Sequence, residues 1–549
     1  MDLPDHLQAA TLLEELLDLR QAMEQIEHQE AETLRAVDPV HRPSARNLLH
    51  FLSFCDRTSP RLAKRLRERG LSSLAGCEGY LMAELDAVIA VLARLEGRAD
   101  LAPARDPVAP PVAGRHEGRE RMRGHREHLL GRPATPDSAT IMVTLPTEAA
   151  DDPNLIRELV EAGMTIARIN CAHDGPEVWR AFVEQVLQAQ RETGRRCRIA
   201  MDLAGPKLRT GTLPFLPGVI RARPRRDRYG RLVRPARIRA LPAADEALPL
   251  PEGAVHLPIV NRGWQDLRPG QRLHGHDASG RRRELVVEAC DRSGLWLRTD
   301  ENCRFTAGQV FTAREGGAQV VVADLPPAPG ELMLHAGDRL RLTAADTPAP
   351  DAVPCTLPDV FGDVRPGERI LFDDGRIGGV VRAVSPEELQ VEITAARPRG
   401  SRLRSDKGIN LPDSDLHTPA LTAKDLRDLG FATAHADLVS YSFVHRPEDV
   451  AALHRALACR GRSDLGVVLK IETRRAFERL PRLLLAAMRY PAPFGVMIAR
   501  GDLAIECGWD ALAEIQEEIL RICEAAHVPC IWATQVLEEM ARHGMPTRA

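Results

Sequence analysis

The chain has 549 residues, more than one hydrophobic core usually serves, so we expect several domains. Its 74 basic and 77 acidic residues nearly balance, which gives no support to binding of nucleic acid or of an anionic membrane. The eleven cysteines form no CxxC pair, which argues against a zinc site and a disulfide framework and favours a cytoplasmic protein with reduced thiols. No stretch approaches 18 apolar residues, which argues against a membrane span.

Residues 1–130 are predicted to form an N-terminal helical extension that ends in a linker. Leucines recur there at the three- and four-residue spacing of amphipathic helices, as in Leu12, Leu16 and Leu19. A stretch rich in proline and alanine, from Ala102 to Arg115, is typical of a linker.

Residues 131–211 are predicted to begin a β/α barrel. We expect strands at 141–145, 165–170 and 198–202, with helices at 154–161 and 177–192 between them. Alternation of apolar strands with helices is typical of a parallel sheet.

Residues 212–406 interrupt this alternation with short β-branched runs, prolines and glycines, and with no convincing helix. They predict an inserted, β-rich domain. The alternation returns in residues 407–549, with strands expected near 438–443, 466–469, 495–498 and 529–535. This makes seven strands where a closed barrel has eight, so we expect the second part of the barrel to be incomplete in this sequence.

Polar residues follow successive predicted strands, where the chemistry of a β/α barrel lies. They are Arg168, Asn170, His173, Asp202, Arg209, Ser442, Lys470, Glu472, Arg500, Asp502, Thr534 and Gln535. Two carboxylates, Glu472 and Asp502, suit a divalent cation, and a lysine beside them can stabilise charge on a phosphoryl group or an enolate.

Each of these positions also has a structural interpretation. His173 could cap a helix, Glu472 and Arg500 could form an ion pair between adjacent strands, and Asp202 could simply end its strand. For Lys470 the functional interpretation is favoured, because a lysine buried at a strand end without a charged ligand would be costly.

Seven short segments, in this order, resemble the pyruvate kinase family. They are ARIN at 167–170, GPKLRTG at 205–211, FDDG at 372–375, KGINLP at 407–412, KIE at 470–472, ARGDL at 499–503 and ATQ at 533–535. Together they span roughly residues 140–211 and 365–549. The resemblance implies a (β/α)8-type barrel interrupted after its third strand by a β-rich lid domain.

The resemblance also implies a glycolytic enzyme that moves the phosphoryl group of phosphoenolpyruvate to ADP, giving pyruvate and ATP with Mg²⁺ or Mn²⁺. It implies no nucleic-acid or membrane partner and is compatible with a homo-oligomer.

By the same resemblance, Glu472 and Asp502 are expected to bind the metal, and Lys470, Arg168 and Thr534 to be catalytic. Substrate contacts are expected from Ala499, Gly501, Asp502, Thr534 and Ser442. Nucleotide contacts are expected from Asn170, His173, Arg209 and Lys407.

Two positions depart from the family pattern. Ala172 stands where potassium-dependent members have a serine, and Lys207 stands where they have a glutamate. Because an ammonium can take the place of a monovalent cation, we predict activity that is independent of potassium.

Two other classes of function remain open. One is a catalytically weak regulatory protein that binds nucleotide or phosphoenolpyruvate, with the helical N-terminus as its interaction surface. The other is a metal-dependent aldolase or lyase acting on an oxoacid, against which Arg168, His173 and Lys407 argue because such an enzyme would not need them for ADP.

Overall fold

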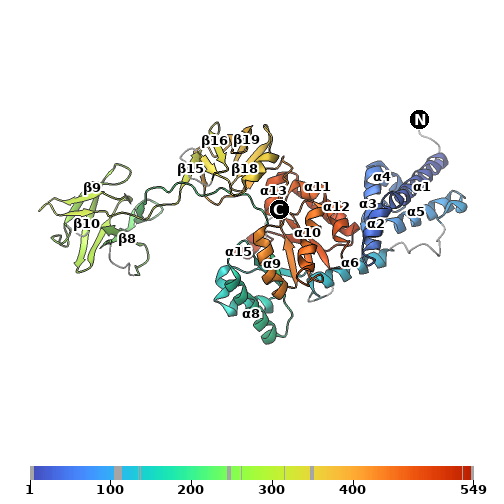
Figure 1. Ribbon diagram of the computed structural model, residues 1–549, viewed down its shortest axis with the longest axis horizontal. Coiled ribbons are helices and arrows are strands. Elements are labelled where there is room, and N and C mark those ends of the chain that lie inside the picture. The colour runs from blue at the N-terminus through green and yellow to red at the C-terminus, as the bar shows by residue number, and fades with distance from the viewer. Residues whose placement is uncertain are drawn as a thin grey trace. The chain divides into compact units, whose positions relative to one another are not determined.

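The computed structural model describes residues 5–103, 114–133, 135, 138–243, 249–260, 263–314, 316–345, 352–534 and 536–545 (Figure 1). Most of the expected linker between Ala102 and Arg115, and Gln535, lie outside the described residues. The chain divides into two compact units, each described by itself. The first comprises Met1–Leu208, Asp359–Pro386 and Gly408–Ala549, and the second comprises Arg209–Pro358 and Glu387–Lys407.

The N-terminal part of the first unit is helical, as predicted. Its helices are α1 (Asp5–Gln29), α2 (Ala31–Ala36), α3 (Arg42–Arg57), α4 (Pro60–Glu68), α5 (Leu81–Leu95) and α6 (Arg115–Leu130). Helix α1 packs against α3 and α5. The periodic leucines Leu12, Leu16 and Leu85 are fully buried there, which is why these segments form helices with one apolar face.

A parallel sheet of seven strands follows, and its strand number agrees with the prediction. The strands are β1 (Ile141–Thr144), β2 (Met164–Asn170), β3 (Arg198–Asp202), β23 (Leu438–Tyr441), β24 (Gly466–Ile471), β25 (Phe494–Ala499) and β26 (Cys530–Ala533). They lie in chain order, each paired in parallel with the next, so all their carboxyl ends meet at one edge. We call this edge the rim.

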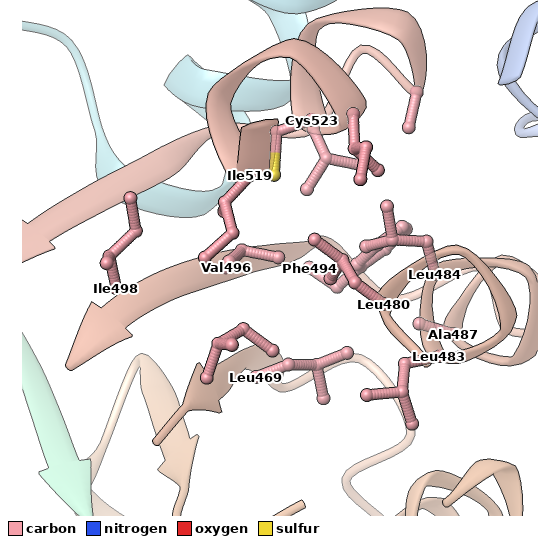
Figure 2. Close-up of a cluster of buried hydrophobic side chains, with 14 of the residues drawn as sticks. Leu469, Leu480, Leu483, Leu484, Ala487, Phe494, Val496, Ile498, Ile519 and Cys523 are labelled. Carbon is pink, nitrogen blue, oxygen red and sulfur yellow. The ribbon is translucent and has the colours of Figure 1, made fainter. Parts of the chain in front are cut away.

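Helices connect the strands and cover the sheet (Figure 1). They are α7 (Pro153–Glu161), α8 (Pro176–Thr193), α9 (Ala423–His435), α10 (Pro447–Ala458), α11 (Arg474–Glu478), α12 (Leu480–Ala487), α13 (Arg500–Cys507), α14 (Leu512–Ala525) and α15 (Glu538–His543). Figure 2 shows Leu469, Val496 and Ile498 of the sheet in one cluster with Leu483 of α12 and Ile519 of α14. This continuous core explains why β24 and β25 are apolar along nearly their whole length.

The last turn of α6 packs against the start of two strands, at the end of the sheet opposite the rim. A Cβ atom on Gly466 would lie 2.8 Å from a methyl of Leu129, and one on Gly495 would lie 2.5 Å from its other methyl. Leu129 and Leu130 are buried with Ile166 and other strand residues in a separate small core. The two glycines therefore let α6 approach the sheet closely.

The second unit is built of short strands, as the sequence of the inserted segment predicts. Its largest sheet joins β7 (Ala236–Pro242), β8 (Ala254–Ile259), β9 (Arg272–His276), β10 (Arg282–Asp291), β11 (Gly294–Thr299), β13 (Val310–Ala313) and β14 (Gln319–Val321) over a core of its own. Further strands of this unit are β4 (Ile220–Ala222), β5 (Arg225–Arg226), β6 (Leu232–Arg234), β12 (Cys303–Phe305), β15 (Glu331–Leu334), β16 (Arg339–Thr343), β17 (Ala352–Pro354), β20 (Glu388–Ala395) and β21 (Ser401–Arg404).

Three strands in or just after the expected insert belong to the first unit. They are β18 (Arg369–Phe372) and β19 (Ile377–Val384), which pair with each other, and β22 (Ile409–Asn410), which pairs with β18. Residues Asp359–Pro386 thus belong to the same compact unit as the barrel strands.

Candidate active site

Lys470 is the centre of a buried polar cluster at the rim. It is the last but one residue of β24, and its side chain is 9% exposed. Its Nζ lies 2.8 Å from Oε1 of Glu472, 2.7 Å from Oγ of Ser442 and 3.2 Å from Oδ2 of Asp202. Three neighbouring strand ends therefore supply oxygen atoms to one ammonium group.

The charge of Lys470 is maintained by these partners. Burial by itself would lower the pKa of the ammonium, but the carboxylates of Asp202 and Glu472 outweigh it and raise that pKa above its usual value. Lys470 is therefore a buried cation at neutral pH, whose compensation comes from two carboxylates.

Asp202 holds a second cation at the same place. Its Oδ2 also accepts a hydrogen bond from Nη2 of Arg168, and the Nη1 of Arg168 donates to Oγ1 of Thr144 at 2.8 Å. Asp202 is thus not merely the end of its strand, since it bridges Lys470 and Arg168 and holds both guanidinium and ammonium at the rim.

Glu472 is held by the backbone as well as by Lys470. Its Oε2 accepts a hydrogen bond from the N–H of Phe443 at 2.7 Å. Phe443 has a φ of 55°, a conformation that residues with a side chain adopt rarely, and this aims its N–H at the carboxylate. Burial raises the pKa of Glu472, with a further contribution from the nearby charge of Asp502, so the two carboxylates lie close enough to interact.

Asp502 lies in the first turn of α13, directly after β25. Its Oδ1 lies 2.9 Å from Nζ of Lys207, which follows the end of β3 in the chain. Carboxylates are stabilised in the first turn of a helix. The acidic pair Glu472 and Asp502 is therefore flanked by two lysines, one on each carboxylate.

Arg500 and Thr534 lie at the ends of β25 and β26. Arg500 donates from Nε to the carbonyl of Ala533 at 2.9 Å and from Nη2 to that of Thr534, and its guanidinium lies 4.9 Å from the ring centre of Trp532. The ion pair of Arg500 with Glu472 that the sequence left open is absent from the contacts of these described residues. Arg500 instead binds the last strand to α13.

Gly501 and Thr534 are neighbours, because a Cβ on Gly501 would lie 3.5 Å from Cγ2 of Thr534. Ala499 precedes them as the N-cap residue of α13 and is buried. Thr534 is exposed and has a φ of 73°. The backbone at the start of α13 therefore faces the threonine that follows β26.

Asn170 and His173 lie at and after the end of β2. The Oδ1 of Asn170 accepts from the N–H of Ala172 at 3.1 Å, and the side chain of His173 is exposed. His173 does not cap α8, because the N-cap residue of that helix is Gly175. The helix-capping interpretation of His173 is therefore wrong.

Arg209 and Lys407 belong to the second unit, whereas the cluster described above consists of first-unit residues alone. Within the second unit, Arg209 donates from Nη1 to the carbonyl of Asp406 at 3.1 Å, and the N–H of Lys407 donates to Oγ1 of Thr210 at 2.8 Å.

Two further buried residues near Asp502, Glu506 and Asn410, were not identified from the sequence as site residues. Glu506, one helical turn further along α13, accepts a hydrogen bond on Oε1 from Nδ2 of Asn410 at 2.9 Å. Burial raises the pKa of Glu506 to about 7. The spacing of four residues between Asp502 and Glu506, which places both on one helix face, is the sequence signal that could have identified Glu506.

A metal cage made by the protein alone is absent from the described residues, where no group of three or more His, Cys, Asp or Glu side chains could hold an ion. A pair of carboxylates is nevertheless what Mg²⁺ commonly takes from a protein, because this ion keeps several waters and binds substrate phosphates with its remaining positions. The donor set of Glu472 and Asp502 fits such an ion.

No helix in the described part of the chain is long and apolar enough to cross a membrane.

This protein is therefore a β/α-barrel protein with a charged site at the carboxyl ends of its strands. The rim of the open barrel gathers a buried lysine, an arginine and two adjacent carboxylates. The family model for the pyruvate kinase barrel domain matches residues 137–215 and 311–549, which is more than half of the chain. The chain belongs to the pyruvate kinase family.

Individual proteins are similar to parts of this chain. A pyruvate kinase from Clostridium acetobutylicum is 34% identical over 236 residues, which are 42% of this chain and 47% of that protein. One from Mycobacterium tuberculosis is 27% identical over 411 residues, 74% of this chain and 60% of that protein. A crystal structure of a pyruvate kinase from Cryptosporidium parvum aligns with a TM-score of 0.49 and 18% identity, covering 77% of this chain and 63% of that one. The chain thus spans about half the length of the curated relatives that it matches.

Proposed function

We propose that this protein transfers the phosphoryl group of phosphoenolpyruvate to ADP, giving pyruvate and ATP. The observation that carries the proposal is the position of Lys470, a buried ammonium between Asp202, Ser442 and Glu472 at the end of β24. An ammonium preorganised in a water-poor site stabilises negative charge that develops on a transferred phosphoryl group and on the enolate left behind.

Glu472 and Asp502 would hold the divalent metal, Mg²⁺ or Mn²⁺. The interaction of their charges and their adjacent positions after β24 and in α13 support this assignment. When bound, the metal would supply positive charge to the substrate oxygens. The N–H of Phe443 would keep Glu472 oriented both with and without the metal.

The other rim residues would bind and orient the reactants. Arg168, fixed by Thr144 and Asp202, would contact the phosphoryl group. The backbone of Ala499, Gly501 and Asp502 at the start of α13, with Thr534, would bind the substrate carboxylate, and Ser442 would help by orienting Lys470.

Thr534 would also assist protonation of the enolate through a water molecule, because a threonine hydroxyl is itself a poor acid. In the first unit, Asn170 and His173 would contact the nucleotide.

Lys207 would replace a potassium ion. Its contact with Asp502 at 2.9 Å supports this, because the ammonium already supplies one positive charge next to the acidic pair. We accordingly propose activity without potassium. The domain limits 1–130, 131–211, 212–406 and 407–549, the third without Asp359–Pro386, belong to the same proposal, as do a cytoplasmic location and a homo-oligomeric assembly.

A coupled assay of pyruvate formation tests the reaction class. Release of pyruvate from phosphoenolpyruvate should require both ADP and Mg²⁺, and ATP should form in equal amount. Turnover of an oxoacid substrate without ADP would instead indicate a lyase or aldolase. Binding of phosphoenolpyruvate or ADP without any turnover, in a protein whose circular dichroism shows a folded chain, would indicate a regulatory protein.

A further inference from the structure

The second unit carries a strongly basic segment at residues 221–234. Seven of these fourteen residues are arginines, none is a lysine, and Asp227 is the one acidic residue. The near balance of charge over the whole chain does not reveal this local excess. The segment lies between the two ranges that the pyruvate kinase family model matches. What the family implies about partners therefore does not extend to it.

Strand pairing places arginines of this segment opposite other arginines. Between β4 and β12, Arg221 lies directly across from Arg304, and between β5 and β6, Arg225 lies across from Arg234. All four side chains are exposed. Like charges directly opposite each other destabilise a pair of strands. Two such pairs in one short stretch therefore favour an anionic partner that offsets the repulsion.

The arginines of β4 and β12 lie together on the solvent face of their strands. Ala222 and Cys303, which pair with each other, are buried in the core of this unit. Because successive residues of a strand alternate between its two faces, Arg221 and Arg304 share the opposite face. The surface that we call the arginine patch consists of Arg221, Arg223, Arg225, Arg234 and Arg304, all of them exposed.

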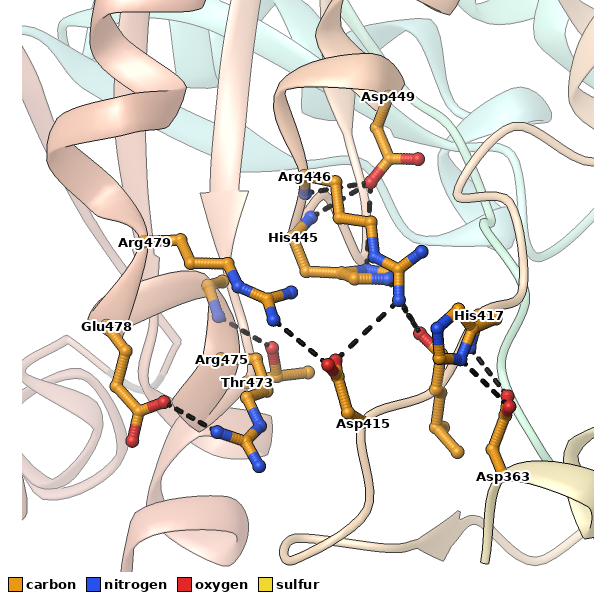
Figure 3. A network of polar contacts seen from close by, with 12 residues as sticks. Asp363, Asp415, His417, His445, Arg446, Asp449, Thr473, Arg475, Glu478 and Arg479 are labelled. Atoms are coloured by element: carbon orange, nitrogen blue, oxygen red, sulfur yellow. Dashed lines mark hydrogen bonds and ion pairs between the residues drawn. The ribbon is translucent and has the colours of Figure 1, made fainter.

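The patch is not neutralised within the described residues. Apart from Arg234, which donates from Nη2 to the carbonyl of Glu252 at 2.9 Å, its side chains make no hydrogen bond, ion pair or ring contact there. Arginines of the first unit differ, as Figure 3 shows for Asp415, which lies 3.0 Å from Arg479 and 3.7 Å from Arg446. The patch thus keeps its guanidinium donors for a ligand.

Acidic side chains close to the patch in sequence are engaged elsewhere. Asp227 accepts two backbone N–H groups of its own turn on Oδ1, at 2.9 and 2.8 Å. Asp300 and Glu301, just before β12, lie 3.5 Å from Arg298 and 3.3 Å from Arg283, neither of which belongs to the patch. A positive excess therefore remains at the patch.

The β5–β6 hairpin adds a flat, exposed surface next to these charges. Tyr229 is 67% exposed, and the guanidinium of Arg228 lies 4.7 Å from its ring centre. Val233 of β6 is 60% exposed. Bases of a single strand stack on aromatic rings and on guanidinium planes, whereas the base faces of a duplex are already stacked on each other. The hairpin therefore favours a single strand over a duplex.

We propose that the arginine patch binds single-stranded nucleic acid, with its guanidinium groups on the phosphodiester backbone and Tyr229 against a base. The planar fork of donors on arginine matches the oxygens of a phosphate. An acidic protein segment would match the charge but would offer no base to stack on Tyr229. The site lies in the second unit alone and does not depend on the proposed function at the rim.

Fluorescence anisotropy of the full chain with labelled oligouridylate and oligothymidylate of about 12 nucleotides tests the patch, because sites of this kind span about 4–16 nucleotides. Both should bind at low salt, and the tighter of the two identifies the natural strand as RNA or DNA. A duplex of the same length and polyglutamate should each bind about tenfold or more weakly than the single strands, because neither offers free base faces.

Substitutions in the patch should change the salt dependence of binding. Arg221→Gln and Arg304→Gln should each reduce the slope of log affinity against log salt by about 0.7, the value for one phosphate contact of a single strand. Tyr229→Ala should weaken binding by about fivefold or more, as loss of one stacked base does. Arg292→Gln, in the exposed turn between β10 and β11, should change neither affinity nor slope.

Two controls separate loss of the site from other causes. Arg221→Gln and Arg304→Gln should not lower the unfolding temperature, because each removes one member of a like-charge pair. Excess ADP should not displace the oligonucleotide, because ADP is assigned to the rim. The proposal is overturned if neither single strand binds at low salt, if duplex or polyglutamate binds as tightly, if ADP displaces the strand, or if the patch variants keep the wild-type slope.

Discussion

The ammonium of Lys207 lies 2.9 Å from Oδ1 of Asp502, although the two residues are 295 positions apart in the chain. Lys207 follows the end of β3, and Asp502 opens α13 after β25. The pair is partly buried, with side-chain exposures of 30% and 23%. A fixed positive charge thus stands beside the acidic pair that we assign to the metal.

From this pair we predict the response to monovalent cations. Pyruvate formation by the wild type should be equal within about twofold in potassium and tetramethylammonium chloride, because Lys207 supplies the charge. Lys207→Ala should lose about tenfold or more in tetramethylammonium, the loss expected for one charge-assisted contact. A large drop of the wild-type rate on removing potassium would contradict the assignment. Lys64→Ala, on the exposed face of α4, is the matched control.

The buried carboxyl of Glu506 predicts a pH dependence of stability. Its pKa is raised to about 7 in the folded chain, chiefly by burial, from an ordinary value of 4.5. The stability that protonated Glu506 contributes is therefore present below pH 4.5 and is lost as the pH rises to about 7, at about 1.4 kcal/mol per pH unit.

Glu506→Gln should remove this loss, because an amide stays neutral and its carbonyl can still accept from Asn410. We expect the variant to be about 1–3 kcal/mol more stable than the wild type at about pH 8 and nearly equal to it at about pH 5, in urea denaturation at both values. Glu517→Gln on the exposed face of α14 should change stability at neither pH. A Glu506→Gln variant that is less stable than the wild type at the higher pH would refute the burial argument.

His527 ties the N-terminal helices to the barrel. Its ring is 1% exposed, with Nδ1 3.0 Å from Oγ of Ser44 and Nε2 2.7 Å from the carbonyl of Gly79. Burial lowers its pKa to about 4, so the folded chain holds it neutral. The stability associated with neutral His527 is present above pH 6.5 and is lost as the pH falls toward 4, because the unfolded chain takes up the proton first.

The free energy of unfolding should therefore fall between pH 6.5 and pH 4 in this part of the molecule. Ser44→Ala should cost about 1–3 kcal/mol at about pH 7, since it leaves Nδ1 of the buried imidazole without a partner. Hydrogen exchange of the α3 amides (Arg42–Arg57) reports this local opening. Unchanged protection of α3 in mild acid and in Ser44→Ala would show that the contact contributes nothing to docking.

The approach of α6 to the sheet predicts a compensating pair of substitutions. A Cβ on Gly495 would lie 2.5 Å from a methyl of the fully buried Leu129 and 3.0 Å from the carbonyl of Pro529. Gly495→Ala should destabilise by about 1–3 kcal/mol, as overpacking of a core does.

Combining it with Leu129→Ala should cost less than the sum of the two single changes, because the clashing methyl is gone. Thermal or urea unfolding of the four proteins gives the coupling energy. Strict additivity would mean that α6 does not press on β25 as described.

Much of the fold follows from the sequence, because the apolar runs around Val468 and Val496 have the length and flanks of parallel strands. Chain order fixes which strands pair, and the residues that end the strands then fall on one rim. The contacts of Lys470 with Glu472 and with Asp202 follow almost directly from that placement.

Other parts of the site could not be predicted in this way. The contact of Lys207 with Asp502 and that of Asn410 with Glu506 join segments distant in sequence, and no periodicity encodes such pairs. The contact of His527 with Ser44 exists only because the N-terminal helices dock on the barrel, which local pattern does not reveal. Arg500 was open to an ion pair with Glu472, yet the carbonyls at and after the end of β26 proved to be its partners.

Lys470→Met tests the central claim most directly. The rate of pyruvate formation from phosphoenolpyruvate, ADP and Mg²⁺ should fall by about a thousandfold or more, the effect of removing preorganised charge from a transferred group. Lys64→Met should keep the wild-type rate, and circular dichroism should show both variants folded. A folded Lys470→Met variant that forms pyruvate within about tenfold of the wild-type rate would contradict the role of Lys470 and with it the proposed function.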